Sequence, residues 1–315
     1  MNSVSGGLVT VVIANYNRCS DLRVALKSVQ TQDYPSVEVI VVDNASTDGS
    51  CQMIAEEFPD TMVIRLKKNL GMDGYSVGFR QARGEFIFQM DNDSIMPEVS
   101  ILTEVIERFC RGPSNLGVVA TRVEEYNSNK DAVEIPQSHD WSRGPIKTGG
   151  FHAGGAGFRR AFLTQVGFYN SDVFLYGSEL FLQMKFLAAG FQILYFPEII
   201  MLHKSSPVAR SPQSLYYMIR NNYWFLRCFA TPIQQVFLLP RMFLHDAVYV
   251  LLEKSPKTLL LALRDGLGKL PDSLTPPLRS TEADFVAKVK EFCNQYTMAA
   301  LLAKIRTRSI RLLGS

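Results

Sequence analysis

The sequence predicts an α/β fold, in which a mainly parallel sheet is flanked by helices and followed by a C-terminal helical extension. Short runs rich in Val and Ile alternate with helical repeats from residue 8 to about residue 90. This order favours a parallel sheet that is covered on both faces. Beyond about residue 211, apolar residues recur only at helical spacing. We therefore expect a sheet domain over residues 1–210 and a helical extension over residues 211–315.

Composition indicates a folded protein without a nucleic-acid partner. The chain has 315 residues, enough for more than one domain. Hydrophobic residues make up 47% and charged residues 20%, which excludes a disordered chain. The formal net charge is only +3, so no global basic character points to nucleic acid. The five cysteines are scattered without a Cys-x-x-Cys pair, which favours a reducing compartment.

Neither a secretion signal nor a membrane span is expected from the sequence. No basic segment precedes a long apolar stretch near the N-terminus. The most apolar later segment, residues 233–252, contains four residues that are costly in a bilayer: Pro240, Arg241, His245 and Asp246. We expect a cytoplasmic protein, with peripheral contact at the inner face of the cell membrane left open.

The first half of the sheet is predicted element by element. Residues 8–14 form an apolar, Val-rich run typical of a buried strand. Apolar residues then repeat at helical spacing over residues 22–29. Residues 37–42 predict a second buried strand, and residues 43–49 are rich in loop and cap residues that lead into a helix containing Ile54.

The second half continues the alternation. Residues 61–66 predict a third strand, residues 75–82 a helix, and residues 85–90 a fourth strand that stops at Asp91. Residues 94–97 follow at once, and we expect them to begin the next helix.

Polar residues follow three of these strands directly. They are Asn15 to Asn17, Asp43 with Asn44, and Asp91 to Asp93. Ligands of open parallel sheets bind beyond the carboxyl ends of the strands, because the loops converge there. The three groups are therefore expected to gather at one edge of the sheet.

Asp91 and Asp93 have the spacing of a divalent-metal site. Two carboxylates on one short turn can share a cation and, through it, a diphosphate. Asp-x-Asp also occurs in ordinary surface turns, but its place directly after a buried strand favours a site. Asn92 between them is expected to fill the turn without a role of its own.

The remaining chain predicts a glycine-dense segment, a short strand and several helices. Residues 148–157 contain glycines that permit close backbone approach to a ligand. Residues 193–196 predict a strand that ends at Pro197, ahead of His203. Helices are expected over residues 215–229, 233–252 and 256–267, and with breaks over residues 282–313.

Several motifs together resemble the family 2 glycosyltransferases, which adopt the glycosyltransferase-A fold. They are VVIANYNR at residues 11–18, EVIVVDNASTDGS at residues 38–50, NLG at residues 69–71, RGE at residues 83–85, the Asp91–Asp93 triplet, GGAGFRR at residues 154–160, YGSE at residues 176–179, His203, and Arg220 with Asn221. The order and spacing agree over roughly residues 8–227. The subgroup most similar to the chain contains rhamnosyltransferase-like enzymes of bacterial surface polysaccharide, and Asp265–Leu267 also fits it.

The resemblance implies an activity and its partners. The family moves a sugar from a nucleotide donor, here a UDP- or dTDP-sugar, to a hydroxyl of a glycan or lipid-linked acceptor. Inversion at the anomeric carbon and a Mg²⁺ or Mn²⁺ cofactor are expected. An oligomer is left open.

The resemblance also implies site residues. The metal ligands are Asp91, Asp93 and His203, and Glu179 is the general base. The donor-binding residues are Asn15, Asn17, Asp43, Asn44, Asp73, Asp91 and His152. Asp43 is expected to accept from the pyrimidine base, since a carboxylate offers acceptors only; the alternative for Asp43 is a turn or cap residue.

Glu179 occupies the second acid position of a motif from which the chain departs. Ser178 replaces the first acid, and Phe181 stands where another Asp is common. The alternative for Glu179 is a residue that merely interacts with the dipole of the helix it begins. Asp172 is the reserve candidate for the base.

Two further alternatives stay open, and a third, a nucleotidyltransferase, is disfavoured. Ser178 and Phe181 favour a degenerate module that binds a nucleotide sugar without turnover. A nucleotidyltransferase would carry a Gly-rich basic loop after the first strand, where this chain has Asn15 to Arg18. Residues 299–313 mix four basic residues with apolar ones, which fits either an anionic membrane surface or a packed helix.

Overall fold

A computed structural model describes residues 7–127, 130–134, 146–148, 150–204, 212–252, 255–276 and 278–297. The chain divides into two compact units. The sheet unit comprises Met1–Phe174 and Ser178–Pro207, and the helical unit comprises Leu175–Gly177 and Val208–Ser315.

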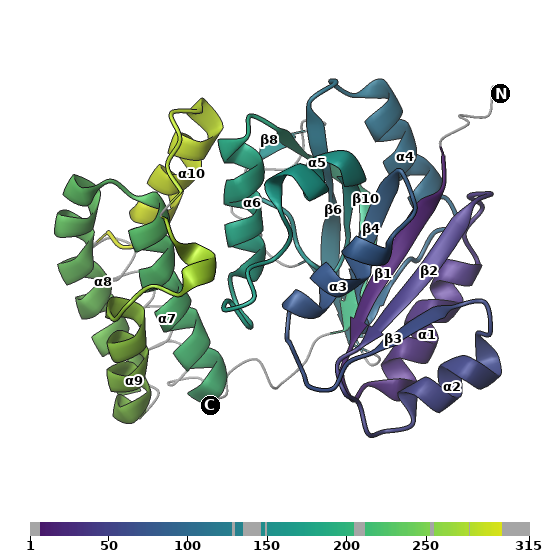
Figure 1. Ribbon diagram of the computed structural model, residues 1–315, viewed down its shortest axis with the longest axis horizontal. Coiled ribbons are helices and arrows are strands. Elements are labelled where there is room, and N and C mark those ends of the chain that lie inside the picture. The colour runs from purple at the N-terminus through teal and green to yellow at the C-terminus, as the bar shows by residue number, and fades with distance from the viewer. Residues whose placement is uncertain are drawn as a thin grey trace. The chain divides into compact units, whose positions relative to one another are not determined.

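The sheet unit is built on one mixed sheet (Figure 1), in which the first four strands of the chain are parallel and a later strand, Ala156–Arg159, is antiparallel to both of its neighbours. The order of the described strands is β3-β2-β1-β4-β9-β6-β10-β5, with β7 paired to β6 and β8 to β10. The strands are β1 Val9–Asn15, β2 Val37–Asp43, β3 Met62–Arg65, β4 Phe86–Asp91, β5 Ser94–Ile95, β6 Leu116–Asn127, β7 Lys130–Glu134, β8 Ile146–Thr148, β9 Ala156–Arg159 and β10 Gln192–Lys204.

Helices flank this sheet and also make up most of the second unit. The sheet unit contains α1 Cys19–Gln30, α2 Ser50–Glu57, α3 Asp73–Gln81, α4 Ile101–Arg111, α5 Arg160–Val166 and α6 Ser178–Ala188. The helical unit contains α7 Pro212–Phe229, α8 Pro232–Leu252, α9 Pro256–Leu267 and α10 Ala283–Asn294, with a short 3₁₀ turn at Asp272–Leu274. The predicted fold class is therefore confirmed.

The register of the central strands brings their carboxyl ends to one edge. β1 lies between β2 and β4 and is parallel to both. Asn15 pairs with Asp43, and Ala14 pairs with Asp91. The interiors of β1, β2 and β4 are mostly buried, as the Val and Ile runs of β1 and β2 predicted. The expected convergence of polar groups at this edge is confirmed.

Two predicted boundaries are wrong, and both bear on the site. Ser94 and Ile95 do not begin a helix; they form β5, whose backbone pairs antiparallel with Leu202 and His203. The predicted strand that ended at Pro197 continues as β10 to Lys204. Proline lacks an N–H, but the register shift between Phe196 and Ile200 absorbs it, and the ladder to β6 resumes beyond.

The described part of the helical unit ends at residue 297. The predicted basic helix over residues 299–313 therefore lies outside the described residues. None of the helices within the described ranges combines the length and apolar character that crossing a bilayer requires.

Candidate active site

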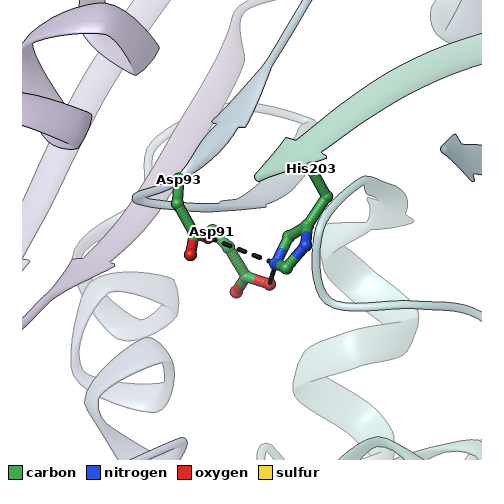
Figure 2. A group of neighbouring side chains, drawn as sticks. All are labelled: Asp91, Asp93 and His203. Carbon is green, nitrogen blue, oxygen red and sulfur yellow. Dashed lines mark ion pairs between the residues drawn. The ribbon is translucent and has the colours of Figure 1, made fainter. Parts of the chain in front are cut away.

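Asp91, Asp93 and His203 form a cluster at the carboxyl edge of the sheet (Figure 2). Asp91 ends β4, Asp93 lies in the turn that follows, and His203 lies near the end of β10. The pairing of His203 with Ser94 brings β10 against this turn. His203 Nε2 lies 3.2 Å from Asp93 Oδ1 and 3.7 Å from Asp91 Oδ2. One ligand atom from each residue falls within 4.8 Å of the other two.

Hydrogen bonds hold the Asp91 carboxylate and the Asp93 backbone in place. The Tyr75 hydroxyl donates to Asp91 Oδ1 at 2.7 Å and contacts the Met90 carbonyl at 2.9 Å. The backbone N–H of Lys204 donates to the Asp93 carbonyl at 2.9 Å. Tyr75 was not singled out from the sequence, because only the fold shows that its hydroxyl reaches the end of β4.

The charges of the cluster stabilise one another. Burial raises the pKa of Asp93. The hydrogen bond from His203 and the charges of His203 and Arg18 lower this pKa by more than burial raises it, so the net pKa lies below its usual range. Burial lowers the pKa of His203, but the hydrogen bond and charge of Asp93, together with the charges of Asp91 and Glu125, outweigh burial and raise the pKa. His203 Nε2 thus faces both carboxylates, with Asp93 as the nearer partner.

These residues fit a divalent cation. Two carboxylate oxygens approach the same imidazole nitrogen, and a bound cation would take the place of a proton on Nε2. Carboxylates suit Mg²⁺ and Mn²⁺, and the imidazole adds a ligand that transition metals accept more readily.

Arg18 and Lys204 add positive charge beside the cluster. Arg18 Nη1 donates to Asp93 Oδ2 at 2.8 Å and to Asp21 Oδ2 at 3.2 Å. Lys204 Nζ donates to the other oxygen of Asp21 at 2.7 Å. Asp21 thus forms ion pairs with both Arg18 and Lys204, and the side chains of these two basic residues are partly exposed. The sequence signal for Arg18 was its place on the same loop as Asn15 and Asn17.

Asn15 and Asn17 hold the loop that follows β2. Asn15 is fully buried, and its amide donates to Ser46 Oγ at 3.2 Å and to Asp43 Oδ1 at 3.4 Å. Asn17 adopts a left-handed φ of 49° and accepts from the Thr47 N–H at 2.8 Å. Their described contacts order the loop between β2 and α2.

Asn92 does more than fill its turn. Its amide donates to Asn15 Oδ1 at 2.8 Å and so joins the metal-site turn to the β1 end. The expectation that Asn92 has no role of its own was wrong. The spacing of residues in the sequence cannot show that the ends of β1 and β4 lie side by side.

Asp43 and Asn44 are buried and engaged in local bonds. Asp43 Oδ2 accepts from the Ser46 N–H at 3.1 Å, which is the contact expected if Asp43 is a turn residue. Asn44 Oδ1 accepts from the Leu70 N–H at 3.1 Å. A Cβ on Gly74 would lie 2.7 Å from Asn44 Nδ2, so α3 can begin there only because Gly74 has no side chain. Base recognition by Asp43 stays a prediction.

Glu179 lies in the first turn of α6 with a partly buried side chain. Burial raises the pKa of Glu179 to about 7; its backbone hydrogen bond lowers the pKa, and the charge of Asp91 raises it. The Glu179 carboxyl thus lies close enough to Asp91 for the two charges to interact. Ser178 Oγ donates to the Val173 carbonyl at 2.7 Å and fixes the turn before it, while Phe181 is buried in the core. Asp172, the reserve candidate, is exposed.

Asp73 begins α3 and lies close to α6. Burial lowers the pKa of Lys185 in α6 to about 8, and the charge of Asp73 opposes this shift. The Met72 N–H donates to the Phe174 carbonyl at 2.9 Å, which joins the loops that precede α3 and α6. Asp73 and Glu179 therefore lie at the starts of two helices, α3 and α6, whose preceding loops are hydrogen-bonded to each other.

His152 lies behind His203. Its Nδ1 accepts from the Gly154 N–H at 2.9 Å, and the two imidazole rings meet edge to face with centroids 5.6 Å apart. Burial lowers the pKa of His152, which favours the neutral ring. His152 thus supports the ring orientation of His203.

In the helical unit, Asn221 binds the segment that leads into α6. Its amide donates to the carbonyls of Leu175 and Tyr176, both at 2.7 Å. The Arg220 guanidinium donates to Asn221 Oδ1 and stacks on Trp224 at 3.9 Å. Arg220 and Asn221 thus order residues 175–177, from which the chain passes directly to Ser178.

Curated relatives with short or partial matches are glycosyltransferases and polysaccharide-synthesis proteins. An uncharacterized glycosyltransferase of Nostoc is 34% identical over 28% of this chain and 28% of the relative. The succinoglycan biosynthesis protein ExoO of Rhizobium meliloti is 36% identical over 32% and 29%. A poly-beta-1,6-N-acetyl-D-glucosamine synthase of Staphylococcus epidermidis is 24% identical over 61% and 48%. The chain spans half or less of each relative's length.

Solved structures share the fold. The mannosyltransferase PcManGT of Pyrobaculum calidifontis, solved with GDP-Man and Mn²⁺, is 19% identical with a TM-score of 0.57 over 96% of this chain and 86% of that one. Residues 1–349 of S. aureus TarS, solved with UDP-GlcNAc, are 17% identical with a TM-score of 0.60 over 92% and 91%. A model of the family described as "Glycosyl transferase family 2" matches residues 10–167, half of the sequence. This chain therefore belongs to glycosyl transferase family 2.

Proposed function

We propose that the protein is an inverting, metal-dependent glycosyltransferase that moves a hexosyl or deoxyhexosyl group from a UDP- or dTDP-sugar to a hydroxyl acceptor. The Asp91, Asp93 and His203 cluster, at the strand ends of a family 2 chain, is the observation that supports it. The catalytic domain is assigned to residues 1–210.

Asp91, Asp93 and His203 would hold Mg²⁺ or Mn²⁺. When bound, the cation supplies charge neutralisation for a leaving diphosphate. Asn15 and Asn17 order the loop against which the nucleoside lies, with Asp43, Asn44 and Asp73 around it, and His152 supports the metal-side wall. Arg18, next to Asp93, adds a donor for the diphosphate oxygens.

Glu179 accepts the proton from the acceptor hydroxyl as that oxygen attacks the anomeric carbon from the side opposite the leaving group. Its pKa of about 7 suits this task, because a base works best with a pKa near the working pH. The carboxylate must be ionised to act.

The acceptor is proposed to be a glycan or a lipid-linked glycan in bacterial cell-surface polysaccharide synthesis. Relatives named for succinoglycan and poly-beta-1,6-N-acetyl-D-glucosamine synthesis support this class. A deoxyhexose such as rhamnose is the proposed sugar, and the proposed location is cytoplasmic, peripheral at the inner face of the cell membrane.

A panel of UDP-, dTDP- and GDP-sugars, assayed for transfer and for slow hydrolysis with Mn²⁺ and with excess chelator, tests the function. We expect turnover of a pyrimidine donor that chelator abolishes and Mn²⁺ restores. Tight nucleotide binding without any turnover would favour the degenerate binding module, and full transfer in chelator would contradict metal dependence.

Pyrimidine nucleotides are expected to bind more tightly than purine nucleotides, since Asp43 at the end of β2 presents acceptors to the N3–H of uracil or thymine. Calorimetric titration of UDP, dTDP, GDP and ADP in Mn²⁺ measures this. Asp43→Asn should reduce the preference for UDP. Tighter binding of GDP would count against the assignment.

Arg18→Ala is expected to weaken UDP binding in Mn²⁺ by about ten- to a hundredfold, because a hydrogen bond to a charged group is worth about 1.5–3 kcal/mol. Without nucleotide, the same variant should bind Mn²⁺ at least as tightly as wild type, because a cation that competes for Asp93 is gone. Arg23→Ala, which removes a partly exposed pair with Glu57, is the matched control. Weaker binding of both ligands would assign Arg18 a structural role only.

A further inference from the structure

The exposed side of α8 is apolar along most of its length. Five large apolar residues on it are between 46% and 71% exposed: Ile233, Val236, Phe237, Phe243 and Leu244. Their spacing places them on one stripe of the helix. Single exposed apolar residues are ordinary, but a continuous stripe of this kind marks an interaction surface.

The polar residues that interrupt this segment in the sequence do not interrupt the stripe. His245 and Asp246 are buried on the opposite side of α8, together with Met242. The exposed side of α8 therefore carries Arg241 as its charged residue among the described positions, and no Asp or Glu. The average hydropathy of the segment does not show that its polar and exposed apolar residues lie on opposite sides of the helix.

α9 contacts α8 in the same unit (Figure 1). The exposed side of α9 is also apolar and basic. Leu260, Leu261 and Leu267 are 47% to 68% exposed. Lys257 and Arg264 lie on the same side. Arg264 also pairs with Asp265, which itself accepts from Tyr216. The exposed sides of both helices thus combine large apolar groups with basic ones.

The charge of the helical unit indicates which partner fits. Residues 208–315 contain 15 Lys and Arg and seven Asp and Glu, a formal charge of +8, whereas residues 1–207 contain 18 and 23, a charge of −5. Without residues 298–315, which carry four of the basic residues, the helical segment still has an excess of +4. A second copy docked through the same surface would bring these positive charges together.

We propose that the exposed sides of α8 and α9 bind an anionic lipid bilayer surface, with the apolar residues at the level of the headgroups and Arg241, Lys257 and Arg264 against lipid phosphates. Such a helix lies in the interface instead of crossing it. This proposal does not depend on sugar transfer, because it concerns a surface whose binding can be measured without turnover.

The test is co-sedimentation of the full chain with vesicles of phosphatidylcholine alone and of phosphatidylcholine with 30% phosphatidylglycerol, a composition chosen at about the anionic content that gives a clear surface potential. We expect binding to the anionic vesicles only, and loss of it in high salt. The double variant Val236→Glu/Phe237→Glu should lower the partition coefficient at least about tenfold.

Val99→Glu is the matched control, because Val99 is 54% exposed on the sheet unit and undergoes the same chemical change. It should bind vesicles like wild type, and UDP titration should show that both variants are folded. Four outcomes would overturn the proposal. They are absence of binding to anionic vesicles, equal binding to both vesicle types, unchanged binding by the double variant, and a stable dimer that the double variant disrupts while vesicle binding stays absent.

Discussion

Glu179→Gln is expected to lower the rate of sugar transfer by about a hundred- to ten-thousandfold, the usual effect of removing a general base. The amide keeps the size and hydrogen bonding of the carboxylate but cannot accept the proton. Donor affinity, measured by calorimetry, should stay near wild type, because Glu179 is assigned to the acceptor hydroxyl. Glu179→Asp should retain partial activity through a shorter carboxylate.

The pH dependence of transfer is a second test of Glu179 as the general base. Because the pKa of Glu179 is raised to about 7, the ionised base is lost as the pH falls through 7. Below that pH, wild-type kcat/KM should fall about tenfold per unit, with a plateau above it. Glu179→Gln should lack this limb.

Stability separates this role from a structural one. A carboxyl group whose folded-state pKa is raised contributes stability that is fully present below its unfolded-state pKa and is lost as the pH rises from there through the folded-state pKa, here about 7. At pH 8, Glu179→Gln should therefore melt no lower than wild type. Near wild-type transfer by Glu179→Gln would place the base elsewhere, and Asp172→Asn would then be the next variant.

Asp93→Asn is expected to weaken Mn²⁺-dependent UDP binding by at least about a hundredfold, since loss even of a residue that only supports a metal ligand costs ten- to a hundredfold. The amide retains one weak oxygen ligand but leaves His203 and Arg18 without their shared carboxylate. Transfer should fall with binding, in contrast to Glu179→Gln.

Asp60→Asn is the control for this variant, because Asp60 is exposed and the substitution is identical. It should leave both affinity and transfer unchanged. UDP binding by Asp93→Asn that still responds fully to Mn²⁺ would remove Asp93 from the metal site.

The sequence predicted the sheet and the convergence of its loops because both follow from local pattern and strand order. The buried Val and Ile runs of β1 and β2 were recognisable as strands, and Asp91 stood directly after the strand predicted over residues 85–90. What it could not predict were contacts between residues far apart in the chain. The bond from Asn92 to Asn15, Tyr75 over Asp91, and the place of Arg18 beside Asp93 all depend on tertiary packing.

The error at β10 has a similar cause. Pro197 is a strong local signal for the end of a strand, but the pairing of residues 200–204 with β6 outweighs it. This continuation places His203 in the sheet. There it pairs with Ser94, which is part of β5 and not of the helix that the sequence predicted. Local pattern alone thus assigned His203 to a loop.

Electron paramagnetic resonance of Mn²⁺ bound with UDP tests the central claim most directly, because nuclei within ligand distance of the ion modulate its echo. We predict ¹⁴N coupling from the imidazole of His203 and ³¹P coupling from the diphosphate in the wild-type protein. His203→Gln should lose the nitrogen coupling and keep the phosphorus coupling, and Asp93→Asn should lose the bound signal. A bound Mn²⁺ that shows neither coupling, or a ¹⁴N coupling that persists in His203→Gln, would contradict the account.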